Sequence, residues 1–197
     1  QWDAASVEHV QAMLAQEKTT TRGTTRPRIN AWTVAALEPH LAQATSDRSF
    51  IRGREAYRDV RCLDCHRFHG TGGSTGPDLT GIGARFSDRD LLEAILEPSK
   101  VIADQYQATM VIRTDDTIDT GRLLESTETQ VVLNVDPYGY EPMAIPRHEI
   151  AEVLPSPVST MPTGHMDVLT LDEALDLLVY LRSSGDPSAP EFRSNQD

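Results

Sequence analysis

The chain has 197 residues, of which 39% are apolar and 24% charged, a composition typical of one globular domain or one domain with an insertion. Its net charge of −12 comes from the second half, because residues 1–100 hold 13 acidic and 13 basic side chains whereas residues 101–197 hold 17 and 5. This imbalance argues against nucleic acid as a partner and favours a redox or other protein partner with a basic docking face. No apolar run is long enough to cross a bilayer, so we expect no membrane span.

The first part of the chain predicts helices. Residues 1–44 are expected to form an N-terminal helical appendage with two short helices, in SVEHVQAMLAQE and AWTVAALEPHLAQA. A third helix, SDRSFIRGREAYRDVRC, has Thr45 or Ser46 as its expected N-cap and leads directly to Cys62.

Two capping boxes mark later helices. Ser87 with Asp90 predicts the start of a helix that Pro98 ends. Thr170 with Glu173 opens the last helix, TLDEALDLLVYLRSSG, whose leucines are spaced along one face.

Between these two helices the pattern changes to short runs rich in valine and isoleucine, separated by turn residues. Residues 106–153 therefore predict a small antiparallel β insertion of five strands, the second beginning at Gly121, and their order favours an SH3-like barrel. The expected fold is mainly α: a helical domain over 45–185, interrupted by this insertion, with a polar tail at 186–197.

Both cysteines of the chain lie in Cys62-Leu63-Asp64-Cys65-His66. A C-x-x-C pair can be a redox disulfide, half of a zinc site or a haem attachment point. A zinc site lacks a second pair of ligands at suitable spacing, and a thioredoxin-type site lacks the alternating strands and helices that would surround it. The histidine directly after Cys65 favours covalent haem, with two thiols for its vinyl groups and the His66 imidazole for its iron.

The segment that follows, GTGGSTGPDLTGIG, is rich in glycines that let the backbone approach a flat ring closely. An iron-binding imidazole also needs an acceptor for its second N–H group, and the Pro77 carbonyl is our candidate.

The sixth iron ligand is predicted to be Met161. It precedes Pro162 in a loop, so its backbone favours an extended conformation from which the thioether can reach the iron. His165, Met166 or an open position remain alternatives. Core packing accounts better for the other methionines, Met13, Met110 and Met143. The remaining histidines, His9, His40, His69 and His148, are expected at the surface. Some arginines near the cysteines are candidates for binding haem propionates: Arg48, Arg52, Arg54, Arg58, Arg61 and Arg67.

Together these motifs resemble class I c-type cytochromes. Residues 61–185 are most similar to the haem-binding domain family described from planctomycete and verrucomicrobial genomes. The strings that carry the resemblance are CLDCHRFHGTGGSTGPDLTGIG, RFSDRDLLEAILEPSKVIADQY, STMPTGHM and LTLDEALDLLVYL. The family more usually has leucine where His165 stands.

The resemblance implies a cytochrome c fold around one covalently bound haem c, with His66 and Met161 as axial ligands of the iron. We expect Pro77 and Leu79 of the G-P-D-L motif to line the haem. The resemblance also implies electron transfer rather than enzymatic activity, and a periplasmic or otherwise exported location. Members are often attached to larger proteins similar to sugar dehydrogenases.

The function predicted from the sequence is therefore that of a monohaem electron carrier, an acceptor or relay for a redox enzyme such as a dehydrogenase. A haem enzyme or gas sensor with a labile sixth ligand is the alternative, in which His165 would be the group near the open face of the haem.

Overall fold

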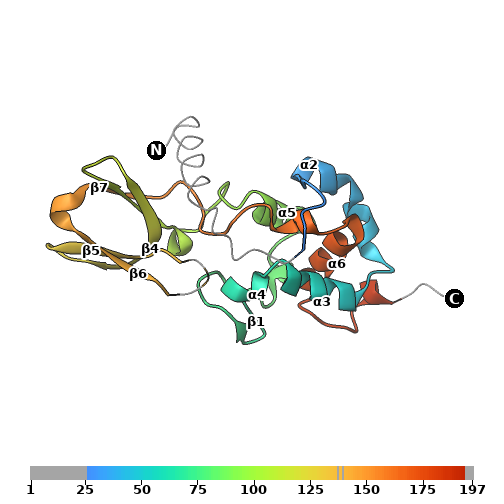
Figure 1. Cartoon of the computed structure of the whole chain (residues 1–197). Coiled ribbons are helices and arrows are strands. Elements are labelled where there is room, and N and C mark those ends of the chain that lie inside the picture. The colour runs from blue at the N-terminus through green and yellow to red at the C-terminus, as the bar shows by residue number, and fades with distance from the viewer. Residues whose placement is uncertain (1–25, 137, 139, 194–197) are drawn as a thin grey trace. The chain divides into compact units, whose positions relative to one another are not determined.

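The structure is a computed structural model, and it describes residues 26–136, 138 and 140–193 (Figure 1). The described chain divides into two compact units. The helical unit comprises residues 26–98 and 162–193, and the sheet unit comprises most of 99–161. The first predicted helix, in SVEHVQAMLAQE, lies outside the described residues.

Among its described residues, the helical unit contains five α-helices, several 3₁₀ helices and one small hairpin. In chain order they are α2 (Val34–Leu37), η1 (Glu38–Thr45), α3 (Phe50–Asp59), α4 (Cys62–Cys65), β1 (Arg67–Phe68), β2 (Thr71–Gly72), η2 (Ile82–Ala84), α5 (Asp88–Leu96), η5 (His165–Val168), α6 (Leu171–Arg182) and η6 (Pro190–Phe192).

Side-chain caps fix where these helices begin. The two predicted capping boxes, Ser87 with Asp90 and Thr170 with Glu173, are both confirmed at the starts of α5 and α6. The expected N-cap of α3 is wrong: Ser49 caps it by accepting a hydrogen bond from the Arg52 amide, because η1 extends through Thr45.

The contact between α3 and α6 forms the centre of the helical unit. At Gly53 the helices approach so closely that a Cβ atom would collide with the Asp176 carbonyl oxygen and lie 2.9 Å from the Tyr180 Cβ. One turn further along α3, Tyr57 is buried against the Tyr180 ring. The absence of a side chain at residue 53 therefore sets the distance between these helices.

Helix α6 is buried on every side, which its single leucine stripe does not predict. All residues from Ala174 to Leu181 are buried. Leu177, Leu178 and Leu181 share a core with α3 and α5, whereas Leu175 and Val179 pack against Ala44.

Residues 26–44 are part of this core, although the sequence suggested a separate appendage. Val34 and Leu37 are buried in the same cluster as the residues of α6, and Trp32 packs against it. At the other end, Phe192 of η6 lies edge-on to Phe50, so the segment predicted as a tail also packs on the helices.

The sheet unit consists of five antiparallel strands in the spatial order β6-β5-β4-β3-β7. They are β3 (Thr109–Arg113), β4 (Ile118–Ser126), β5 (Gln130–Asn134), β6 (Pro142–Pro146) and β7 (Ile150–Pro155), and two 3₁₀ turns, η3 (Asp104–Tyr106) and η4 (Arg147–Glu149), accompany them. The predicted five-stranded antiparallel unit is confirmed, but β4 begins at Ile118 rather than Gly121, because Ile118 still pairs with Ile112.

Strand β3, which lies between β4 and β7, has buried side chains on both faces. Val111 packs with Val131 and Leu133 on one face, whereas Met110 packs with Leu154 on the other. The expectation of a mainly α fold therefore holds for the helical unit alone, because a whole second unit of this chain is built from strands. Closure of these strands into an SH3-like barrel stays a prediction.

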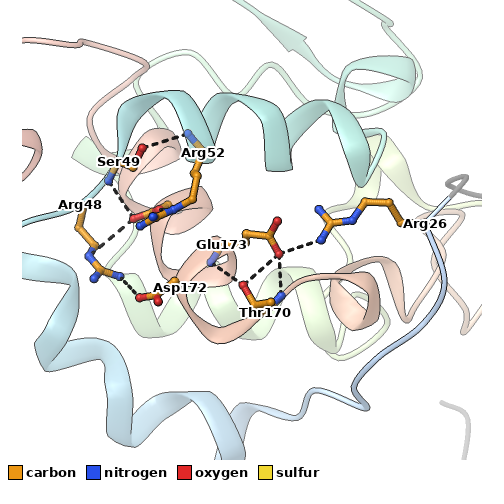
Figure 2. A network of polar contacts seen from close by, with 8 residues as sticks. Arg26, Arg48, Ser49, Arg52, Thr170, Asp172 and Glu173 are labelled. Carbon is orange, nitrogen blue, oxygen red and sulfur yellow. Dashed lines mark hydrogen bonds and ion pairs between the residues drawn. The ribbon is translucent and has the colours of Figure 1, made fainter.

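Charged side chains join the start of α3 to the middle of α6 (Figure 2). The fully buried Asp176 carboxylate pairs with the Arg52 Nε at 2.6 Å and the Arg48 Nε at 3.6 Å, and it accepts from the Ser49 amide at 3.0 Å. A buried carboxylate is tolerated only when it is paired and hydrogen-bonded in this way.

A second ion-pair group joins the other end of α3 to the start of α6. Arg26 bonds Glu173 at 2.9 Å (Figure 2) and Asp59 at 3.0 Å, so it links the start of α6 to the end of α3. The hydrogen bond from Arg26, reinforced by the Thr170 cap, lowers the pKa of Glu173 to about 2.

Replacing Gly53 with alanine should lower the free energy of unfolding by about 1–3 kcal/mol, because the added methyl group overpacks the contact between α3 and α6. Urea unfolding of Gly53→Ala measures this. Glu55→Ala, at an exposed position of the same helix, is the control and should change stability by about 0.5 kcal/mol or less. Equal unfolding midpoints for Gly53→Ala and the wild type would contradict the close approach.

The Arg26 contacts predict a pH dependence. Because the folded state lowers the pKa of Glu173 from 4.5 to about 2, its contribution is present above pH 4.5 and is lost as the pH falls toward 2. Arg26→Gln should therefore cost about 1 kcal/mol or less at pH 6, and this difference from the wild type should shrink between pH 4.5 and pH 2. Urea unfolding over this pH range measures it, with Arg58→Gln at an exposed position of α3 as the control. If the loss of unfolding free energy in Arg26→Gln did not change with pH, the ion pair between Arg26 and Glu173 would be contradicted.

Candidate functional site

The two cysteines and the histidine lie on one turn of helix. Arg61 adopts a left-handed conformation directly before this turn, with φ of 62°, and so redirects the chain at the end of α3. Cys62 and Cys65 begin and end α4, form no disulfide, and are both partly exposed. The His66 amide closes the turn by donating to the Cys62 carbonyl at 2.9 Å. Because Cys62 and Cys65 are three residues apart on a helical turn, their thiols lie on the same side of that turn.

The His66 side chain is held in the form that binds a metal. Its Nδ1 lies 2.8 Å from the Pro77 carbonyl oxygen and must donate to it, which leaves the lone pair of Nε2 free. The hydrogen bond to Pro77 expected from the sequence is thus confirmed. Burial lowers the pKa of His66, although the Pro77 bond partly offsets this, so the imidazole is neutral at pH 7.

Glycines bring the following loop against this turn. A Cβ atom on Gly76 would lie 2.7 Å from the His66 Cε1, and one on Gly73 would collide with the Asp64 carbonyl oxygen. The amides of these two glycines donate to the carbonyls of Cys65 and Leu63, at 2.8 and 2.9 Å. The loop therefore packs its backbone directly against the imidazole, where any side chain would displace the ring.

Two further features belong to this turn. Burial of its sulfur raises the pKa of the Cys62 thiol to about 12, although the residue as a whole is partly exposed. The Tyr57 hydroxyl, within electrostatic range of Cys62, is buried and makes no hydrogen bond to any described residue. A buried hydroxyl without a hydrogen bond, near two thiols and an imidazole whose Nε2 is available to a metal, is consistent with covalent haem c at this turn.

Leu79 lies in the loop that returns from Pro77. Its amide donates to the Arg67 carbonyl at 2.9 Å, and its side chain packs against the helical core. Contact of Pro77 and Leu79 with haem stays a prediction.

The structure assigns Met161 to the sheet unit, of which it is the last residue, while Pro162 begins the second segment of the helical unit. Its amide donates to the Ser159 hydroxyl at 3.1 Å, and its side chain is half-buried. The structure does not bring Met161 and His66 together within one unit, so the role of Met161 as iron ligand stays a prediction. Met110 is fully buried and Met143 packs in the sheet core, as expected.

His165 belongs to the helical unit, as His66 does. It is half-buried in η5, and burial lowers its pKa, as do the charges of Arg61 and Arg28 and, more weakly, His66. The other alternative, Met166, is fully buried in the helical core, so core packing accounts for this side chain.

Several arginines proposed to bind propionates have protein partners. Arg48 and Arg52 pair with the buried Asp176, and Arg61 pairs with Asp64. Arg54 lies over the Phe50 ring at 5.7 Å. The exposed positions expected for His69 and His148 are confirmed.

The sequence pattern identified the turn but missed two features of its surroundings. The close contact of Gly76 with His66 could not be distinguished among the several glycines of this segment. Only the position of Gly76 directly before Pro77 indicated it. The extended residues 26–32 carry no helical or strand pattern, so their hydrogen bonds to residues 167–169 could not be predicted.

A comparison with family models matches residues 50–121 to the family described as Cytochrome c. The match supports a c-type cytochrome. It includes α3, the C-x-x-C-H turn and α5, and it ends before Met161 and α6. No curated protein matches the chain. Among the described residues, no helix combines the length and apolarity needed to span a membrane.

Gly76→Ala should displace the His66 imidazole and reduce the fraction of chains that carry haem after expression with a cytochrome maturation system, at least severalfold. Intact mass measures this fraction. Ser74→Ala, at an exposed position of the same loop, is the control and should leave the fraction unchanged. Full haem loading of Gly76→Ala, with an unaltered spectrum, would refute the tight packing of this loop on His66.

Proposed function

We propose that this chain is a monohaem c-type cytochrome that transfers electrons. The observation that carries the proposal is the single turn holding Cys62, Cys65 and a neutral His66, whose Nδ1 is held by Pro77 so that Nε2 is free. The family match over residues 50–121, a range that includes this turn, also supports the proposal.

Each residue of the site has a defined part in this proposal. Cys62 and Cys65 would hold the porphyrin through thioether bonds, and His66 and Met161 would be the axial ligands. When bound, the haem supplies a one-electron couple between ferrous and ferric iron. The buried Tyr57 and the loop at Gly76 would exclude water from one edge of the site.

The partner is proposed to be a redox protein with a basic docking face, such as a dehydrogenase for which this chain is an acceptor or relay. The sheet unit supports this, because its exposed carboxylates outnumber its basic side chains. The exposed carboxylates are those of Asp104, Asp115, Asp116, Glu125, Glu128, Glu141 and Glu152. Charges of one sign at the surface steer an oppositely charged partner and speed its association.

The finer family assignment is also a proposal. The sheet order, in which the last strand β7 pairs with the first strand β3, supports an SH3-like barrel inserted before α6, as in the planctomycete and verrucomicrobial haem-binding domains. Covalent attachment of haem c takes place outside the bacterial cytoplasm, so the proposal includes a periplasmic or otherwise exported location, either alone or as part of a larger protein.

A haem enzyme or gas sensor is the second candidate, and His165 is the observation that favours it. This half-buried imidazole is in the same unit as His66 and is close enough for their charges to interact. If Met161 does not bind the iron, His165 could act as an acid–base group or as a displaceable ligand.

Replacing Met161 and His165 separately distinguishes these functions. For an electron carrier, Met161→Ala should lower the reduction potential and let carbon monoxide bind the ferrous protein, because a thioether ligand favours the ferrous state and closes the sixth position. His165→Ala should leave both unchanged. Redox titration and carbon monoxide difference spectra measure this. Rapid carbon monoxide binding to the wild type, unchanged in Met161→Ala, would contradict electron transfer as the function and favour the sensor or enzyme.

A further inference from the structure

An extended segment before α2 lies along the loop that leads into α6. We call residues 26–32 the strap. The amides of Ile29 and Asn30 both donate to the Asp167 carbonyl, at 2.8 and 3.0 Å, and the Trp32 amide donates to the Asp167 Oδ1 at 3.1 Å. Three backbone donors of the strap therefore converge on one residue.

Two side chains of the strap continue this contact. The Asn30 amide Nδ2 and the Trp32 indole Nε1 donate to the same carbonyl, that of Leu169, at 2.8 and 2.9 Å. Leu169 is fully buried, so its carbonyl has no access to bulk water and needs a protein donor. The strap uses both acceptor positions of this oxygen.

The strap is also fixed at both of its own ends. Arg26 pairs with Glu173, as Figure 2 shows, and with Asp59, and the Trp32 side chain packs against the helical core. Between them, the Arg28 guanidinium lies beside Gly164, where an added Cβ would be 3.1 Å from its Nη2. The segment is thus a fixed support for the loop and not a loose end.

The supported loop begins with Gly164 in a left-handed turn at φ of 76° and includes His165, the alternative sixth ligand. Met161, the proposed sixth ligand, lies three residues before this loop and belongs to the sheet unit. We propose that Asn30 and Trp32 are positioning residues: by holding Asp167 and Leu169 they fix the chain that follows Met161 and so keep the sixth position of the iron closed. The inference rests on the proposed function.

Binding of an external ligand to the iron measures the fraction of molecules in which the sixth position is open. Imidazole can bind the ferric iron only in the fraction of molecules whose sixth position is open, so its apparent dissociation constant falls in proportion as that fraction rises. A global loss of stability does not produce this effect while the protein stays folded.

The experiment compares Asn30→Ala, Trp32→Phe and the double variant, all as full-length haem-bearing protein. Each single variant leaves Leu169 with one donor, so we expect the apparent imidazole affinity to rise about fivefold or less. The double variant leaves a buried carbonyl without a donor, so its affinity should rise by more than the product of the two single effects.

Ser87→Ala is the matched control. It removes a capping hydrogen bond of α5, at a site without any contact to the strap among the described hydrogen bonds, and should lower the unfolding midpoint while leaving the imidazole affinity unchanged. Urea unfolding confirms that each variant is folded under the binding conditions, and Asn30→Ala decides the question if the double variant does not fold.

Wild-type imidazole affinity in all three strap variants would overturn the inference, and so would an equal rise in Ser87→Ala. Both results require haem-bearing protein and would leave the proposed function intact. A wild-type chain that carries no haem would instead refute the proposed function, and this inference with it.

Discussion

The close approach of α3 and α6 at Gly53 is the constraint on which the helical unit depends. It brings Tyr57 against Tyr180 one turn later and so fixes the end of α3. The left-handed Arg61 then turns the chain directly into the cysteines. The position of the thiols is therefore set by a backbone contact at a residue nine positions earlier, and not by the C-x-x-C-H motif itself.

Polar contacts then connect the rest of the unit to the same two helices. The buried Asp176 fixes the start of α3 through Arg48 and Arg52, and Arg26 links the end of α3 to the start of α6. The strap continues from Arg26 to the loop before α6. The site at α4 and the loop with His165 are thus both fixed by contacts among α3, α6 and the strap, although the residues involved are far apart in the sequence.

Local chemistry made part of this structure predictable. Capping boxes depend on residues three apart, so Ser87 and Thr170 marked their helices, and the Pro77 carbonyl followed from the need of an iron-binding imidazole for an acceptor. The N-cap of α3 could not be chosen among nearby serines and threonines by spacing alone. The burial of α6 on all sides and the strap depend on contacts between distant segments, which no local pattern encodes. The ligand role of Met161 stays a prediction for the same reason.

The central claim is that one haem is bonded through Cys62 and Cys65 and that its iron is bound by His66. The most direct measurement is the intact mass and visible spectrum of the purified chain after expression with a bacterial cytochrome maturation system. The account predicts a mass increase of one haem that persists in denaturant, and sharp bands of a six-coordinate c-type haem on reduction. A colourless protein with the mass of the bare polypeptide would contradict it.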